Sequence, residues 1–164
     1  MHRRRLLGWS ASLLVATTLS ARGQGTAEPT KAQPELPREK LVIVTADGKR
    51  HEFNIEVAKT AEQQITGLMF RKSVATDAGM LFVWGHPIDS EMWMKNTLVP
   101  LDMVFIGADS RITHIAEDTV PESLAVINGG AGVVATLELQ GGITARLGLL
   151  VGDHVSSAAL GPTP

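Results

Sequence analysis

Near the start of the chain, two stretches have the polarity pattern of β-strands. Residues 41–45 (LVIVT) are mostly β-branched and apolar, and residues 51–57 then alternate between polar and apolar positions. Between the two stretches, Asp47 and Gly48 form a dipeptide typical of a two-residue turn. The pattern predicts a β-hairpin with one buried face and one solvated face.

A short helix is expected after this hairpin. Thr60 is a suitable N-cap residue, and Gln63 three positions later completes a capping box. Ile65, Leu68 and Met69 then recur at helical spacing. We therefore expect one face of this helix to pack on the sheet.

The rest of the chain contains short apolar segments separated by polar or glycine-rich turns, without the alternation of strands and long helices typical of a parallel sheet. This pattern predicts an α+β fold of mostly antiparallel strands, curled into a small sheet or partial β-barrel with two short helices. The expected strands are residues 80–84, 91–95, 102–106, 111–116, 133–139 and 153–155, and residues 143–149 are expected to form a short helix or turn.

The first 23 residues have the three-part pattern of an export signal. Three arginines at positions 3–5 precede an apolar run over residues 6–19, and residues 21–23 (ARG) offer small side chains to a signal peptidase. The run is shorter and less apolar than the roughly 18 residues of a membrane-spanning helix, so no stable membrane anchor is expected after cleavage. Both the general secretory route and the twin-arginine route stay open. We expect a periplasmic or secreted protein.

Composition and charge narrow the function further. Residues 24–39 carry three prolines among polar residues and are expected to form a flexible tether, followed by one globular domain over residues 40–160. Loss of residues 1–23 removes four arginines, leaving 11 basic and 17 acidic residues and a net charge of −6. This balance argues against nucleic acid as a partner, and we expect a monomer. The absence of cysteine excludes disulfides, thiolate metal sites and cysteine nucleophiles.

Several motifs follow one another between residues 57 and 155. They are residues 67–71 (GLMFR), 79–83 (GMLFV), 93–97 (WMKNT), 100–106 (PLDMVFI), 137–141 (LELQG) and 152–153 (GD). In their order and spacing the chain closely resembles the uncharacterised bacterial and archaeal family called domain of unknown function 192 (DUF192). The resemblance implies a small β-rich domain, often exported, with no established reaction. Some members have a cysteine after the position of Pro121, where this chain has Glu122 and Ser123, so a thiol-based role cannot apply here.

The candidate site lies in the predicted hairpin over residues 91–106. If Lys95 pairs opposite Asp102, Trp93 joins them on one face, because side chains alternate along a strand. An aromatic ring beside a cation and a carboxylate can stack on a sugar ring and bind its hydroxyl groups. Three nearby polar side chains could add contacts to such a ligand: Asn96, Thr97 and Arg71. The simpler alternative is that Lys95 and Asp102 form only a structural ion pair.

These observations favour an exported, non-enzymatic binding or accessory domain for a small polar ligand such as a carbohydrate. One alternative is a hydrolase in which Asp102 acts as the base and Lys95 tunes it. Another is a periplasmic copper carrier built on the methionines at positions 92 and 94. The histidines have no ligand spacing such as His-x-x-x-His, and no phosphate-binding loop or nucleophile elbow occurs, so we expect no metal or cofactor.

Overall fold

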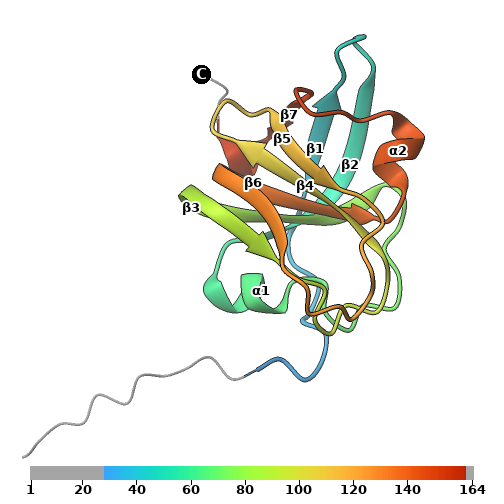
Figure 1. Cartoon of the computed structure of the whole chain (residues 1–164), viewed down its shortest axis with the longest axis vertical. Helices are drawn as coiled ribbons and strands as arrows, with labels where there is room; N and C mark the ends of the chain where they lie inside the picture. Colours follow the sequence, from blue (N-terminus) through green and yellow to red (C-terminus); the bar gives the residue numbers. More distant parts are fainter. Residues whose placement is uncertain (1–27, 162–164) are drawn as a thin grey trace, which may run out of the picture.

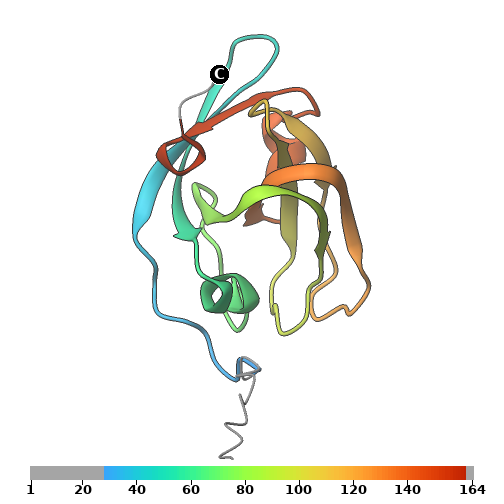
Figure 2. The same ribbon diagram turned by 90° about the vertical axis from the view of Figure 1, so that its left-hand side faces the viewer.

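Seven strands form one curled sheet in the order β5-β4-β6-β3-β2-β1-β7 (Figures 1 and 2). The structure, a computed structural model, describes residues 28–161. The expected fold class is confirmed: a mostly antiparallel half-barrel with two short helices. The elements are β1 (Arg38–Val44), β2 (Arg50–Ala58), α1 (Ala61–Thr66), β3 (Ala78–Met92), β4 (Leu101–Gly107), β5 (Ile112–Ala116), β6 (Ile127–Gln140), α2 (Ile143–Leu147), β7 (His154–Ser157) and a 3₁₀ turn (Ala158–Leu160).

The two edges of the sheet approach each other and nearly close the barrel. An isolated antiparallel bridge joins Arg111, next to β5, to His154 at the start of β7. Two backbone hydrogen bonds flank it, from the Ile112 amide to the Asp153 carbonyl at 2.9 Å and from the Val155 amide to the Ser110 carbonyl at 2.8 Å. These contacts pair backbone groups that an open sheet would leave free at its edges.

Two apolar cores lie on opposite faces of this sheet. The first fills the inside of the half-barrel, with side chains from all seven strands and from α2. The second lies on the outer face of β2, β3, β6 and β4, beneath α1 and the loops at one end of the barrel (Figure 2). The central strands are therefore buried on both faces, as the apolar run over residues 80–84 predicts.

The capping box of α1 is present, since the Thr60 side chain accepts from the Gln63 amide and the Gln63 side chain accepts from the Thr60 amide. The expected packing of this helix is wrong in part, because no residue of α1 is buried and Ile65 is 40% exposed. The apolar contact comes from the turn after the helix, where Leu68 and Met69 are buried.

The predicted hairpin over residues 91–106 does not form. β3 continues to Met92 and pairs with β6, whereas β4 pairs with β5 and β6. In the sheet order β6 therefore lies between β3 and β4, and residues 93–100 form the loop that joins the end of β3, paired with the start of β6, to the start of β4, paired with the end of β6. Spacing along the chain cannot reveal this arrangement, because the intervening strand comes more than 20 residues later.

The part of the predicted tether that the structure describes, residues 28–39, lies against the domain. The Gln33 side chain donates to the carbonyls of Gln63 and Gly67 at 3.1 and 2.9 Å, and Leu36 packs on the second core. β1 already begins at Arg38, so the folded part starts before residue 40. The predicted export signal, residues 1–23, lies outside the described residues. No helix within residues 28–161 is long and apolar enough to cross a membrane.

Candidate functional site

Asp102 is fully buried and serves as a structural acceptor. One of its carboxylate oxygens accepts from the amides of Asp118 and Gly142, both at 2.8 Å. The other accepts from the Thr144 amide at 2.8 Å and from the Thr144 hydroxyl at 2.7 Å. Asp102 thus fastens β4 to the start of α2, and its oxygens are already used.

Trp93 and Lys95 lie together on the surface, away from Asp102. The Lys95 ammonium is 5.3 Å from the centre of the Trp93 ring, a cation–π distance, and it forms an ion pair with Glu28. Trp93 is 48% exposed. The predicted grouping of Trp93, Lys95 and Asp102 on one face is therefore wrong, because it depended on the hairpin that does not form. This separation also leaves a hydrolase based on Lys95 and Asp102 without support.

Asn96 and Thr97 maintain the loop in which they lie. Asn96 adopts a left-handed backbone conformation (φ +56°), and its carbonyl accepts from the Phe70 amide at 2.8 Å. Thr97 is buried, and its amide bonds to the Met94 carbonyl at 3.0 Å. Both residues join neighbouring segments of chain, which is a structural role.

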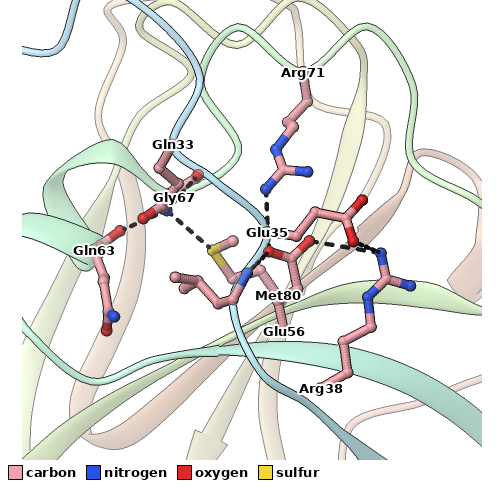
Figure 3. Close-up of polar contacts among 9 residues, drawn as sticks. Gln33, Glu35, Arg38, Glu56, Gln63, Gly67, Arg71 and Met80 are labelled. Atoms are coloured by element: carbon pink, nitrogen blue, oxygen red, sulfur yellow. Dashed lines mark hydrogen bonds and ion pairs between the residues drawn. The ribbon is translucent and has the colours of Figure 1, made fainter.

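Arg71, the last of the predicted site residues, belongs to a buried charged cluster (Figure 3). Its guanidinium donates from Nη2 to the Glu56 carboxylate at 3.1 Å, and the Leu36 amide donates to the same oxygen at 2.7 Å. Arg38 approaches the other oxygen at 3.9 Å and also pairs with Glu35 at 3.3 Å. The Glu56 side chain is only 6% exposed, yet Arg71 Nε is buried without a hydrogen-bond partner.

Glu138 lies in the middle of the same outer face. It is the cross-strand neighbour of Met80 on β3 and of Met103 on β4, and Met80 is in turn the neighbour of Glu56 on β2. Its Oε2 atom is buried without a partner, and burial raises the pKa of its carboxyl group to about 8. Glu138 is therefore a neutral acid at pH 7, able both to donate and to accept a hydrogen bond.

Two cavities lie beside the loop segment 72–75, above this face of the sheet. The first, of about 230 Å³, is lined by the Arg71 and Glu56 cluster and by Gly79 of β3. The second, of about 270 Å³, is lined by Lys72, Val99 and Gln140 among others. Both touch Ser73 and Val74, so both border this segment.

Gln140 adds a third polar atom without a partner to this region. It follows Glu138 by two residues on β6, so both side chains leave the same face of the strand. Its Oε1 atom is buried and unpartnered, like Glu138 Oε2 and Arg71 Nε. Buried polar groups are nearly always hydrogen-bonded in native proteins, so three buried polar atoms without partners in one region require an explanation.

Sequence reasoning missed Glu56, Glu138 and Gln140. The alternation along residues 51–57 places Glu56 on the face expected to be solvated, and Glu138 and Gln140 likewise alternate with apolar neighbours on β6. A second buried layer on that face leaves no local signal in the sequence. The one available hint is that Glu138 occurs within the LELQG motif that the chain shares with DUF192.

Within residues 28–161, there is no group of three or more histidine, aspartate or glutamate side chains that could hold a metal ion. Three of the methionines serve as core packing. Met80, Met94 and Met103 are fully buried, and the Met94 sulfur lies 3.1 Å from the Thr119 hydroxyl oxygen. This packing gives no support to a copper carrier.

Comparison with known proteins identifies a family and two similar solved structures. The DUF192 family, described as "Uncharacterized ACR", matches residues 42–157. A similar solved structure, from Sinorhizobium meliloti 1021, is described as a "putative transcription regulator"; it is 40% identical, with a TM-score of 0.75, and the match covers 78% of this chain and 99% of that one. Another, a protein of unknown function from Novosphingobium aromaticivorans DSM 12444, is 36% identical, with a TM-score of 0.72 and coverage of 76% and 90%. No curated protein matches the chain.

Proposed function

The chain belongs to the DUF192 family, and we propose that it is an exported binding domain that holds a small polar ligand on the outer face of its sheet. The site consists of the two cavities beside residues 72–75, with Glu138, Gln140 and Arg71 as the binding groups. The observation that carries this proposal is Glu138, a buried carboxyl group whose Oε2 has no partner. Strongly perturbed acids are characteristic of functional sites, and Glu138 lies between the two cavities in the sheet, two residues before Gln140, which lines the second, and next to Met80, which follows Gly79 of the first.

The three unpartnered atoms define the chemistry of the ligand. Arg71 Nε can only donate, Gln140 Oε1 can only accept, and neutral Glu138 can do both. A ligand with several hydroxyl groups satisfies such a mixed set, because each hydroxyl both donates and accepts. Cavities of about 230 and 270 Å³ lie below the usual range for drug-sized ligands, which favours something as small as one sugar ring.

The first 23 residues support export. The "regulator" description of the Sinorhizobium relative would suggest nucleic acid, but the net charge of −6 expected after cleavage supplies no general attraction to phosphate. Fractionation of cells that produce the full chain tests export. Recovery of a shortened form from the periplasm or medium is the expected result, and a full-length cytoplasmic product would contradict it.

Ligand binding is tested by calorimetric titration of the purified protein with a panel of monosaccharides and polyols. We expect at least one of them to bind, and Glu138→Leu to weaken that binding at least tenfold, since it removes the central donor and acceptor. Glu62→Leu, an exposed change on α1, is the matched control and should bind as the parent does. Binding that survives Glu138→Leu unchanged would exclude this site, and no response from any compound would contradict the proposed ligand class.

A further inference from the structure

Five large apolar side chains are exposed on the two loops at one end of the barrel. In globular proteins, clustered exposed apolar side chains mark sites of interaction, whereas isolated ones do not. We call this group the loop-end patch; its members and their exposed fractions are Trp93 48%, Leu98 43%, Val120 69%, Leu124 67% and Val126 62%.

Hydrogen bonds make these two loops a single surface. The Met94 amide donates to the Ser123 carbonyl at 3.1 Å, and the Glu122 amide donates to the Thr97 carbonyl at 3.0 Å. The backbone of residues 93–100 is thereby held against residues 117–126. The patch is part of the ordered domain and not a set of separate loop tips.

The N-terminal segment reaches the domain at this same end (Figures 1 and 2). Glu28, where the described chain begins, forms an ion pair with Lys95, and Lys95 lies over the Trp93 ring. Only eight residues, 20–27, separate Glu28 from the end of the apolar run at Leu19. Even fully extended, the nine residue steps from Leu19 to Glu28 span about 30 Å, which is about the thickness of a bilayer core.

We propose that the loop-end patch contacts the lipid bilayer while the export segment is attached. This inference rests on the export role proposed above. A membrane-engaged segment over residues 6–19 would bring this end of the barrel, and not the opposite one, toward the lipid. Trp93 has the side chain most typical of membrane interfaces, and the aliphatic members can enter the acyl boundary.

The charges around the patch favour zwitterionic lipid. Residues 117–126 contain Glu117, Asp118 and Glu122 and no lysine or arginine. The one cation beside Trp93, Lys95, is already paired with Glu28. Anionic headgroups would be repelled here, whereas phosphatidylcholine places no net charge against these carboxylates.

The lack of native cysteine allows a clean test on the full chain. A single fluorophore attached to the cysteine of Leu124→Cys reports on the patch. A label at Leu150→Cys is the matched control, since Leu150 is also exposed (65%) and lines a pocket together with residues of the turn between β1 and β2. That turn lies at the opposite end of the molecule from the two loops (Figure 1). With vesicles of phosphatidylcholine that carry brominated acyl chains, we expect the fluorophore at position 124 to be quenched at least twofold more than the one at position 150.

Equal quenching at the two positions, or none at position 124, would overturn the proposal. If the fluorophore at position 124 is shielded from solvent even without lipid, and sedimentation shows a dimer, the patch binds a second copy of the chain. That result would also overturn the proposal. A second variant carries both Leu124→Ser and Val126→Ser, with the fluorophore at Val120→Cys. In this variant the fluorophore at position 120 should be quenched no more than the one at position 150. Because export is measured by fractionation, a failure of the export role is distinguishable from a failure of lipid contact.

Discussion

The carboxylate of Asp102 is held by both the amide and the hydroxyl of Thr144, a residue 42 positions further along the chain. The same hydroxyl lies 3.0 Å from the Glu117 carboxylate. A hydroxyl has one hydrogen, and the shorter contact, at 2.7 Å, identifies Asp102 as its acceptor. This pair connects β4, α2 and the loop after β5 at the end of the barrel.

Replacement of Asp102 by alanine should strongly destabilise the fold. The change removes the acceptor for three backbone amides and one hydroxyl in a buried place. With roughly 1–3 kcal/mol lost for each buried group left unpaired, and some relaxation, we expect a loss of about 4 kcal/mol in the free energy of unfolding. Urea denaturation of Asp102→Ala and of the exposed control Asp109→Ala measures this. A difference below about 1 kcal/mol between them would contradict the structural role of Asp102.

Met94 gives a second test, of the outer core. Its side chain is fully buried, with 0% of its surface exposed to solvent, and it packs in the second core. Met94→Asp would force an unpaired charge into that core, and we expect it to unfold the domain. Leu98→Asp, in the same loop but 43% exposed, should remain folded. Thermal melts followed by circular dichroism compare the two, and a cooperative melt of Met94→Asp near the parental temperature would show that this face is not a core.

Local sequence signals predicted the local structure well. The capping box at Thr60 and Gln63 forms as expected, and a turn around Asp47 and Gly48 joins β1 to β2. These features depend on hydrogen bonds and backbone preferences between residues at most a few positions apart.

Long-range arrangement could not be obtained in this way. The insertion of β6 between β3 and β4 depends on contacts between residues tens of positions apart, and it separates Asp102 from Trp93 and Lys95. The burial of Glu138 was not predicted, because alternation identifies two faces of a strand but not whether loops cover the second one. The candidate site was therefore displaced from the hairpin loop to the outer face, with only Arg71 in common.

Glu56 and Arg71 provide a third prediction, about the charged cluster. Glu56→Gln removes the negative partner of a guanidinium that is mostly buried, so we expect a loss of roughly 3 kcal/mol. The double variant Glu56→Gln, Arg71→Met leaves no charge of this pair unpaired. Its loss in free energy of unfolding should therefore be smaller than the sum of the losses of the two single variants. A double-mutant cycle by urea denaturation measures the coupling. Strict additivity would show that the ion pair contributes nothing specific.

The pKa of Glu138 gives the last prediction, a fall in stability as the pH rises. Burial raises the pKa of this carboxyl from 4.5 to about 8, so the folded protein keeps a proton that the unfolded chain loses. The stability contribution is complete below pH 4.5, declines as the unfolded chain ionises, and stops declining once the folded state also ionises above about pH 8. At 1.36 kcal/mol for each pKa unit, the decline amounts to at most about 5 kcal/mol.

Glu138→Gln keeps the size and polarity of the side chain but cannot ionise, so this decline should disappear. Relative to the parent, the variant should gain free energy of unfolding steadily from pH 5 to pH 8. Urea denaturation at intervals of half a pH unit tests this, with the exposed change Glu62→Gln as control, which should follow the parent. Parallel curves for the parent and Glu138→Gln would mean that Glu138 is ionised in the folded protein. A neutral donor at the centre of the site would then be lost, and with it the chemistry inferred for the ligand.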